Sequence, residues 1–336
     1  MKDLINKLTS GKNTSNIDSR RYKSFGYQVL GFGAGGTVAP FIEATGGTVT
    51  TVGDFKIHTF TGPGTFAVAS GGTPAGADTA DYLVIAGGGG SARDGAGGGG
   101  AGGYRESSGA ASGCYAVSPL GGSVSAIAVP AGSYPITVGA GGTVGGIPGC
   151  TIATQGASSI FSSITSAGGG RAGQNPAPNT PGGPGGSGGG GRSNQGASGG
   201  AGNTPPVSPP QGNSGGSTYP ATPPQANWGG GGGGGATAAG ENYPPSGAGG
   251  AGATSSINNT PTVRASGGSG GSNNPGAPAA GATPGGGGAG GSSPGGSGTA
   301  GTANTGGGGG GGACGGSPSV GGAGGSGLVI IRYKFQ

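Results

Sequence analysis

The sequence has few of the side chains that carry chemistry in proteins. Among 336 residues there is one histidine, His58, and only 7% of the residues are charged. The segment between Ser166 and Gly327 holds four charged residues: Arg171, Arg192, Glu241 and Arg264. Acid–base, nucleophilic and metal-assisted catalysis each need several such groups brought together. We therefore predict a binding or structural protein that is not an enzyme and uses no cofactor.

Long apolar runs are also missing. No stretch of about 18 apolar residues exists that could span a membrane, so we expect no membrane insertion. Near the N-terminus, Leu4, Ile5 and Leu8 form at most one apolar helical face rather than the core of a signal peptide. We expect the chain to be made in a cytoplasm and to leave, if it does, by a route other than a cleaved signal, such as a virus particle.

Cysteine is scarce as well. The three cysteines, Cys114, Cys150 and Cys314, show neither a CxxC spacing nor the even number of a disulfide framework. Buried or unreactive thiols are one interpretation, and a Cys114–Cys150 bridge is the other. No metal site is predicted.

Positive charge is concentrated at the N-terminus. The net charge is +5, and the first 23 residues contribute +4 of it, from six basic and two acidic residues. Such a tail can bind nucleic acid or an anionic membrane, or it can anchor the protein in an assembly. No alternation of aromatic and basic residues continues beyond it, and we do not predict a nucleic-acid partner.

Strand signals are present between residues 48 and 165. Phe55, Ile57 and Thr59 alternate with Lys56, His58 and Phe60, and short β-branched or aromatic runs follow, separated by Gly, Pro and Asp turns, at 65–68, 82–85, 124–129, 134–138 and 160–164. This pattern predicts a small all-β sandwich domain over residues 37–166. The strongest strand signal is at 328–335, and we predict that residues 328–336 pair back into that domain.

Glycine dominates the segment 167–327. Between Ser166 and Gly327 there are 61 of the 98 glycines and 19 of the 26 prolines. Such a composition is often disordered, but disordered tracts are usually highly charged, and this one is not. Within the runs glycine often recurs at every third residue, as at 182, 185, 188 and 191. The register resets between runs, which excludes a collagen triple helix.

A three-residue repeat in short pieces is typical of polyglycine-II helices that hydrogen-bond laterally, because such helices have no internal hydrogen bonds. The predicted fold class is mostly β plus irregular structure: a small β-sandwich-like domain with an inserted polyglycine-II helical bundle at 167–327 and no substantial α-helix.

Motifs that resemble catalytic signatures have a simpler explanation. The GxGxxG at 31–36 and the GxSxG at 185–189 are expected by chance at this glycine density. His58 lies in an alternating strand, where we expect a surface or half-buried structural role. Tyr219, Trp228 and Tyr243 are the aromatic residues of the glycine-rich segment, and each lies in a proline-rich loop. They are candidates for receptor binding, with capping of the bundle ends as the alternative.

Glycine runs broken by Pro-, Asn-, Tyr- and Trp-containing loops resemble the host-recognition adhesins at the fibre tips of T-even-like bacteriophages. The pieces DYLVIAGGGG (81–90), VPAGSYPITVGAGG (129–142) and GLVIIRYKF (327–335) resemble a glycine-rich domain of marine and cyanobacterial phage tail-fibre proteins. The resemblance covers roughly residues 48–336. It implies stacked polyglycine-II helices whose distal loops contact the host receptor.

One segment departs from that adhesin pattern. The basic head SRRYKSFGYQVLGFGAGG (19–36) looks like an attachment segment for another virion protein. We therefore expect residues 1–36 to anchor the chain in a virion, with Arg20, Arg21, Tyr22, Phe25 and Tyr27 as candidate contacts.

The resemblance implies a phage virion protein, in a tail fibre or other surface appendage, that recognises a host surface protein or glycan without catalysis. The chain would be a homotrimer or a single chain on a trimeric stalk. A structural fibre or decoration protein without its own receptor is the alternative. A cellular glycine-rich or ice-binding protein is disfavoured, because ice binding needs a flat, regular face that these irregular loops do not offer.

Overall fold

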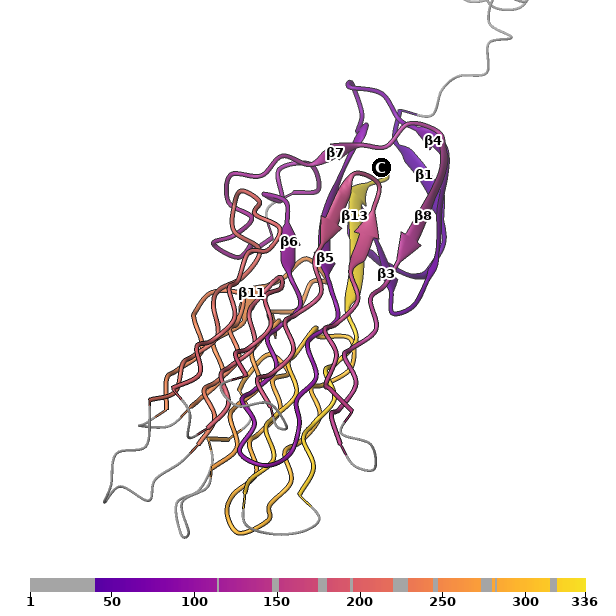
Figure 1. Ribbon diagram of the computed structural model, residues 1–336. Helices are drawn as coiled ribbons and strands as arrows, with labels where there is room; N and C mark the ends of the chain where they lie inside the picture. The colour runs from indigo at the N-terminus through magenta and orange to yellow at the C-terminus, as the bar shows by residue number, and fades with distance from the viewer. Residues whose placement is uncertain are drawn as a thin grey trace, which may run out of the picture.

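The computed structural model describes residues 40–113, 115–146, 151–174, 180–193, 196–219, 229–243, 247–272, 280–281, 283–314 and 319–336. Within these ranges the chain forms strands and extended glycine runs, and no helix. The predicted all-β, sandwich-like fold without substantial α-helix is confirmed. The molecule is elongated, with the strands gathered at one end and the glycine runs extending away from them (Figure 1).

Two antiparallel sheets form the β domain. The first has the order β1-β4-β8-β9-β10 and the second the order β2-β3-β13-β5-β6, with β7 also paired to β5. The strands of the first sheet are β1 (Ile42–Thr45), β4 (Gly64–Gly71), β8 (Gly132–Thr137), β9 (Ser159–Phe161) and β10 (Ile164–Ser166). Those of the second are β2 (Thr48–Val52), β3 (Phe55–Phe60), β5 (Thr79–Ile85), β6 (Tyr104–Glu106), β7 (Ile127–Ala128) and β13 (Leu328–Lys334).

The core of the sandwich is aromatic and β-branched. Phe66 at its centre is fully buried and makes edge-to-face contacts with Phe161 at 6.0 Å and Tyr333 at 6.1 Å between ring centroids. Alternation along β3 and β4 directs every second side chain into this core, as expected for strands with one buried face.

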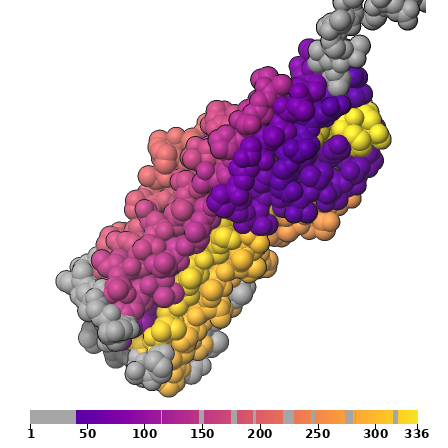
Figure 2. All heavy atoms as spheres, turned by 90° about the vertical axis from the view of Figure 1, so that its right-hand side faces the viewer, coloured from indigo at the N-terminus to yellow at the C-terminus, as the bar shows by residue number. Residues whose placement is uncertain are grey.

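The C-terminal strand completes the second sheet, as the sequence predicts. β13 lies between β3 and β5, antiparallel to both, with Ile331 opposite His58 on one side and Tyr82 on the other. In Figure 2 its end lies among atoms of the N-terminal part of the domain. Strands more than 240 residues apart in sequence therefore share one sheet.

The central strands β5 and β13 of the second sheet are buried on both faces. Leu83, Ile85 and Ile330 point away from the sandwich core and pack with Ile257 beneath a hairpin of β11 (Ala253–Ser255) and β12 (Thr262–Arg264). Burial on both faces explains why β5 and β13 are continuously apolar. The hairpin lies within the segment 167–327, for which the sequence analysis predicts glycine helices and loops but no strand. Three-residue strands leave little periodic signal, and burial of Ile257 holds them in place.

The glycine runs hydrogen-bond laterally with a three-residue period. In the run 96–103, the N–H groups of Gly97 and Gly100 donate to one neighbouring run, at Gly173 and Gly170. The next two positions of each triplet donate to two further runs, so that Gly98 and Ala101 bond to Gly231 and Gly234, and Gly99 and Gly102 bond to Gly309 and Gly306. A rotation of one third of a turn per residue is the geometry of a three-fold helix.

The same run also accepts hydrogen bonds from three other runs. Its carbonyls take N–H groups from residues 86 and 89, 187 and 190, and 268 and 271. Three donating and three accepting directions give the run six bonded neighbours, the hexagonal packing of polyglycine-II helices. We call the laterally bonded runs within residues 86–103, 139–157 and 167–327 the glycine array. It therefore extends beyond the predicted 167–327.

Glycine is required in the array by close approach of neighbouring backbones. A Cβ built on Gly98 would lie 1.9 Å from the carbonyl oxygen of Gly268, and one on Gly99 would lie 2.1 Å from that of Gly89. Neither carbonyl can move without breaking its own hydrogen bonds. The spacing that allows lateral pairing thus leaves no room for a side chain at these two positions.

Candidate functional site

The end of the array farthest from the β domain is where many separate segments meet. The turn 92–95 lies there, between the runs 86–91 and 96–103. Ser193 donates its N–H to Gly95 O at 2.9 Å, and Gly95 donates to Gly312 O at 2.9 Å. Ala92 forms a parallel bridge with Gly145. We call this region the loop end; its described residues are 92–95, 144–146, 151–152, 192–193, 217–219, 242–243, 312–314 and 319–320.

Exposed apolar side chains are concentrated at the loop end. Among the described residues, six large apolar side chains are exposed, and four of them are here: Val144 (41% exposed), Ile152 (58%), Tyr219 (58%) and Val320 (47%). Isolated exposed apolar residues are ordinary. Here four of them, from distant parts of the chain, lie at the same end of the rod.

The predicted aromatic candidates lie in different environments. Tyr219 is exposed, and Asn242 Nδ2 donates to its hydroxyl at 3.5 Å. Tyr243 is only 8% exposed, and its ring covers Gly229, where an added Cβ would lie 2.5 Å from it. Tyr243 therefore caps the end of a glycine run, which is the alternative stated for these residues. Trp228 lies outside the described residues.

Two charged groups of the loop end form an ion pair with each other. Arg192 Nη2 lies 3.4 Å from Asp94 Oδ2. Burial, and secondarily the Asp94 carboxylate, raises the pKa of the Cys314 thiol to about 11. Cys314 is thus a protonated, weakly nucleophilic thiol at neutral pH.

His58 is a core residue. The sequence-based expectation of a surface or half-buried position is wrong, because the side chain is fully buried. Its Nδ1 donates to Gly46 O at 2.7 Å, so in the neutral ring Nε2 accepts from the Tyr333 hydroxyl at 3.0 Å. Burial lowers the pKa of His58, with nearby Lys56 a smaller cause in the same direction. The sequence could not show that Phe66 and Tyr333 pack against the ring of His58.

The buried carboxylates organise loops next to the second sheet. Asp81 accepts hydrogen bonds from Ser107 Oγ at 2.7 Å, from Gly109 N at 3.0 Å and from both the N–H and the hydroxyl of Ser112, at 2.8 and 2.6 Å. The Arg332 guanidinium stacks near the Phe55 and Tyr115 rings, 4.8 and 5.2 Å from their centroids. Among the described residues no three His, Cys, Asp or Glu side chains are grouped to hold a metal ion.

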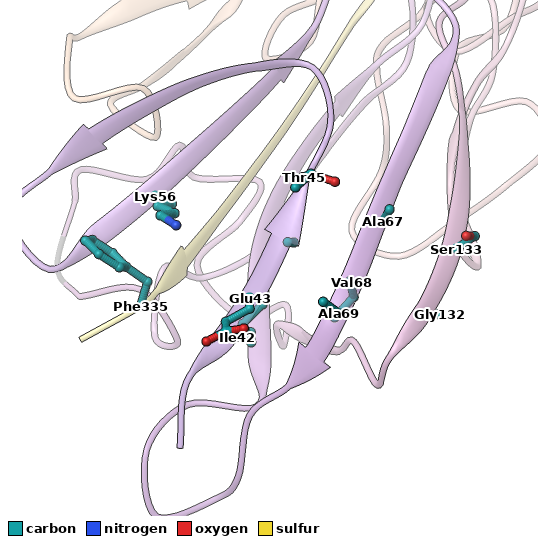
Figure 3. A pocket seen from close by; sticks show the side chains of 11 residues that line it. Ile42, Glu43, Thr45, Lys56, Ala67, Val68, Ala69, Gly132, Ser133 and Phe335 are labelled. Atoms are coloured by element: carbon teal, nitrogen blue, oxygen red, sulfur yellow. The ribbon is translucent and has the colours of Figure 1, made fainter. Parts of the chain in front are cut away.

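A pocket of about 590 Å³ opens on the β domain beside the edge strand β1. Figure 3 shows Lys56 and Phe335 on one side of β1 and Ala67, Ala69 and Ser133 on the other. Lys56 Nζ lies 4.8 Å from the centroid of the Phe335 ring. The pocket is lined by small and apolar residues together with one carboxylate, that of Glu43, and one ammonium group, that of Lys56.

Several predicted residues lie outside the described part of the chain. These are the candidate anchor residues Arg20, Arg21, Tyr22, Phe25 and Tyr27, and the cysteines Cys114 and Cys150. Conversely, Val144, Ile152 and Val320 were not predicted as loop-end residues. Each is a single apolar residue within a glycine-rich or threonine-rich stretch, and only the folded array brings them to one end.

Comparison with known families places the chain in one of them. The model of the glycine-rich domain family matches residues 60–334, which is most of the 336 residues. The chain therefore belongs to the glycine-rich domain family. No curated protein matches it. Over the described residues, no helix has the length and apolar character needed to cross a membrane.

Proposed function

We propose that the protein is a bacteriophage virion protein, in a tail fibre or at a fibre tip, that recognises the host cell surface by non-catalytic binding through its loop end. The observation that carries the proposal is the grouping of Val144, Ile152, Tyr219 and Val320 at one end of a rigid array. Loops held by a rigid scaffold can vary in sequence without disturbing it.

The two ends of the molecule suit two roles. The loop end carries exposed apolar side chains, projects away from the β domain and would contact a host surface protein or glycan. The β domain follows directly on residues 1–39 and would lie toward the rest of the virion, with the basic head contacting other virion proteins. One chain on a trimeric stalk and a homotrimer both fit this arrangement.

The test is binding of the labelled full-length protein to a panel of bacterial strains. We expect strain-specific binding that a Ile152→Ser/Tyr219→Ser/Val320→Ser variant loses while its thermal unfolding is unchanged. The matched control is Val49→Ser/Ile160→Ser, which removes exposed apolar residues from the β domain (47% and 36% exposed). Equal binding by the loop-end variant and the wild type would contradict the assigned surface.

The second candidate function is a structural fibre or decoration protein without a receptor of its own. The pocket beside β1 favours it, since that pocket offers a contact surface remote from the loop end. Folded protein that binds no strain infected by its parent particle, and that is located along a fibre rather than at its tip, would establish this alternative.

A further inference from the structure

The edge strand β2 is open to pairing with another strand. It forms one border of the second sheet and has β3 as its neighbour there. Its sequence is Thr-Val-Thr-Thr-Val, and its first four residues are exposed, with Val49 47% exposed. All five residues are β-branched and uncharged, which gives high strand propensity and no electrostatic protection.

The backbone pattern shows which groups of β2 face outward. Phe335 N donates to Asp54 O, so alternate β3 residues, 56, 58 and 60, form hydrogen-bonded pairs with β13. Phe55, Ile57 and Thr59 then pair with β2, at Val52, Thr50 and Thr48. Val49 and Thr51 therefore direct their N–H and C=O groups away from the sheet.

The other sheet edges are protected. β1 carries a bulge between Glu43 and Ala44, and Glu43 adds an exposed charge. β6 is three residues long, and the N–H of its first residue, Tyr104, donates a hydrogen bond to Gln211 O. β10 is also three residues long, and its Ser166 hydroxyl donates to Val84 O. Bulges, charges, short strands and covering segments are the usual devices against edge pairing, and β2 has none of them.

We propose that β2 pairs with β2 of a second copy of this chain, antiparallel, about a two-fold axis at Thr50. In this register Val49 faces Thr51 of the other copy and exchanges both backbone hydrogen bonds with it, and the reverse pair does the same. Thr50 faces Thr50 of the other copy, and Thr48 faces Val52 of the other copy. The outward N–H and C=O groups of Val49 and Thr51 in one copy are thus paired with those of Thr51 and Val49 in the other copy. An isologous interface requires this reciprocity.

The side chains favour the same partner. Every cross-strand pair is Thr–Val or Thr–Thr, and β-branched pairs and threonine pairs stabilise antiparallel strands. No like charges meet across the axis. Antiparallel pairing makes the two glycine arrays extend in opposite directions and leaves both loop ends free. The pairing is proposed for the free protein, and it is independent of the assigned receptor surface and of the assembly in the virion.

The experiment is sedimentation equilibrium of the full-length protein over a wide concentration range. A five-residue strand buries less than the roughly 800 Å² per partner of a standard interface, so association is expected at high concentration. We expect the weight-average mass to rise from 30.2 kDa toward twice that value. Thr51→Pro removes an outward N–H without removing a bond to β3, and is expected to keep the chain monomeric.

Two further variants complete the test. Val49→Lys places a charge on the edge and is expected to abolish dimers, and it decides the matter if Thr51→Pro does not fold. Ile152→Lys makes the same change at the loop end and is expected to dimerise like the wild type. A monomer at every concentration overturns the proposal, as does a dimer that survives Val49→Lys or one that is lost in Ile152→Lys.

Discussion

The β domain and the glycine array are stabilised by different interactions. In the β domain, side chains such as Phe66 and Tyr333 fill the space between two sheets, and burial of apolar surface is the main stabilising term. In the array the interior contains hardly any side chain, and adjacent backbones are joined by hydrogen bonds in up to six directions. Each such bond contributes only about 0.5–1.5 kcal/mol.

This difference determines how each region tolerates change. Ordering a residue costs about 1–2 kcal/mol, and glycine costs the most. The array must therefore form nearly all of its bonds at once, which makes it intolerant of any local disruption. The β domain can lose one side chain and partly relax around the gap. The two regions meet at the second sheet of the β domain, whose outer face packs on Ala101 and Ala236 of the array.

The sharpest way to break the array is to add one methyl group. Gly98→Ala would place Cβ 1.9 Å from Gly268 O and 2.4 Å from Gly268 C. We expect a loss of unfolding free energy on the order of 5 kcal/mol, because both atoms belong to a bonded backbone. Chemical denaturation measures this. Gly62→Ala is the control, since its Cβ meets no atom within 4 Å; equal stability of the two variants would refute the packing argument.

A cavity in the β domain is expected to cost somewhat less. Phe66 is fully buried against His58, Phe161 and Tyr333. Phe66→Ala should lower the unfolding free energy by about 3–4 kcal/mol, and Phe66→Leu by a smaller amount, because core side chains can shift toward the gap. The same denaturation experiment compares them. If Phe66→Ala proved more damaging than Gly98→Ala, the contrast in tolerance between the two regions would be reversed.

The sequence predicted which kinds of structure the chain forms better than it predicted the residues at which they begin and end. The return of residues 328–336 to the sheet followed from a strongly apolar strand that needs a core, and β13 fulfils it. The three-residue glycine period predicted lateral bonding. The inclusion of residues 86–103 in the array was missed, because their strand-flanking position suggested a turn. Which run neighbours which depends on the packing of many similar segments, and no single residue encodes it.

The candidate site was less predictable than the fold. Proline-rich loops containing Tyr219 and Tyr243 indicated the loop end, but the two tyrosines differ in burial, which depends on whether a glycine lies beneath the ring. Val144, Ile152 and Val320 carry no local signal. His58 was placed too near the surface, because alternation along β3 shows which face a residue occupies but not what covers that face.

Acid should weaken the β domain through His58. Burial places its folded-state pKa below the value of about 6.5 in the unfolded chain. The folded protein thus binds fewer protons, so stability is complete above pH 6.5 and falls as the pH drops toward the folded pKa, by at most about 1.4 kcal/mol per pH unit. Denaturation at pH 7, 6 and 5 measures the slope. His58→Asn should have a flatter slope, and an identical slope would contradict this role.

The smallest expected change in stability is for the exposed tyrosine of the loop end. It distinguishes residues that support the fold from residues of the binding surface. Tyr219 is 58% exposed and Tyr243 is 8% exposed, although Thr218 and Tyr243 pair in one bridge. Tyr219→Ala should change the unfolding free energy by less than about 0.5 kcal/mol, as expected for an exposed site. Tyr243→Ala should cost more, because it uncovers Gly229. Thermal unfolding of both variants tests this pair. A destabilised Tyr219→Ala would make Tyr219 part of the scaffold and remove it from the receptor surface, since cell binding lost with the fold says nothing about contact.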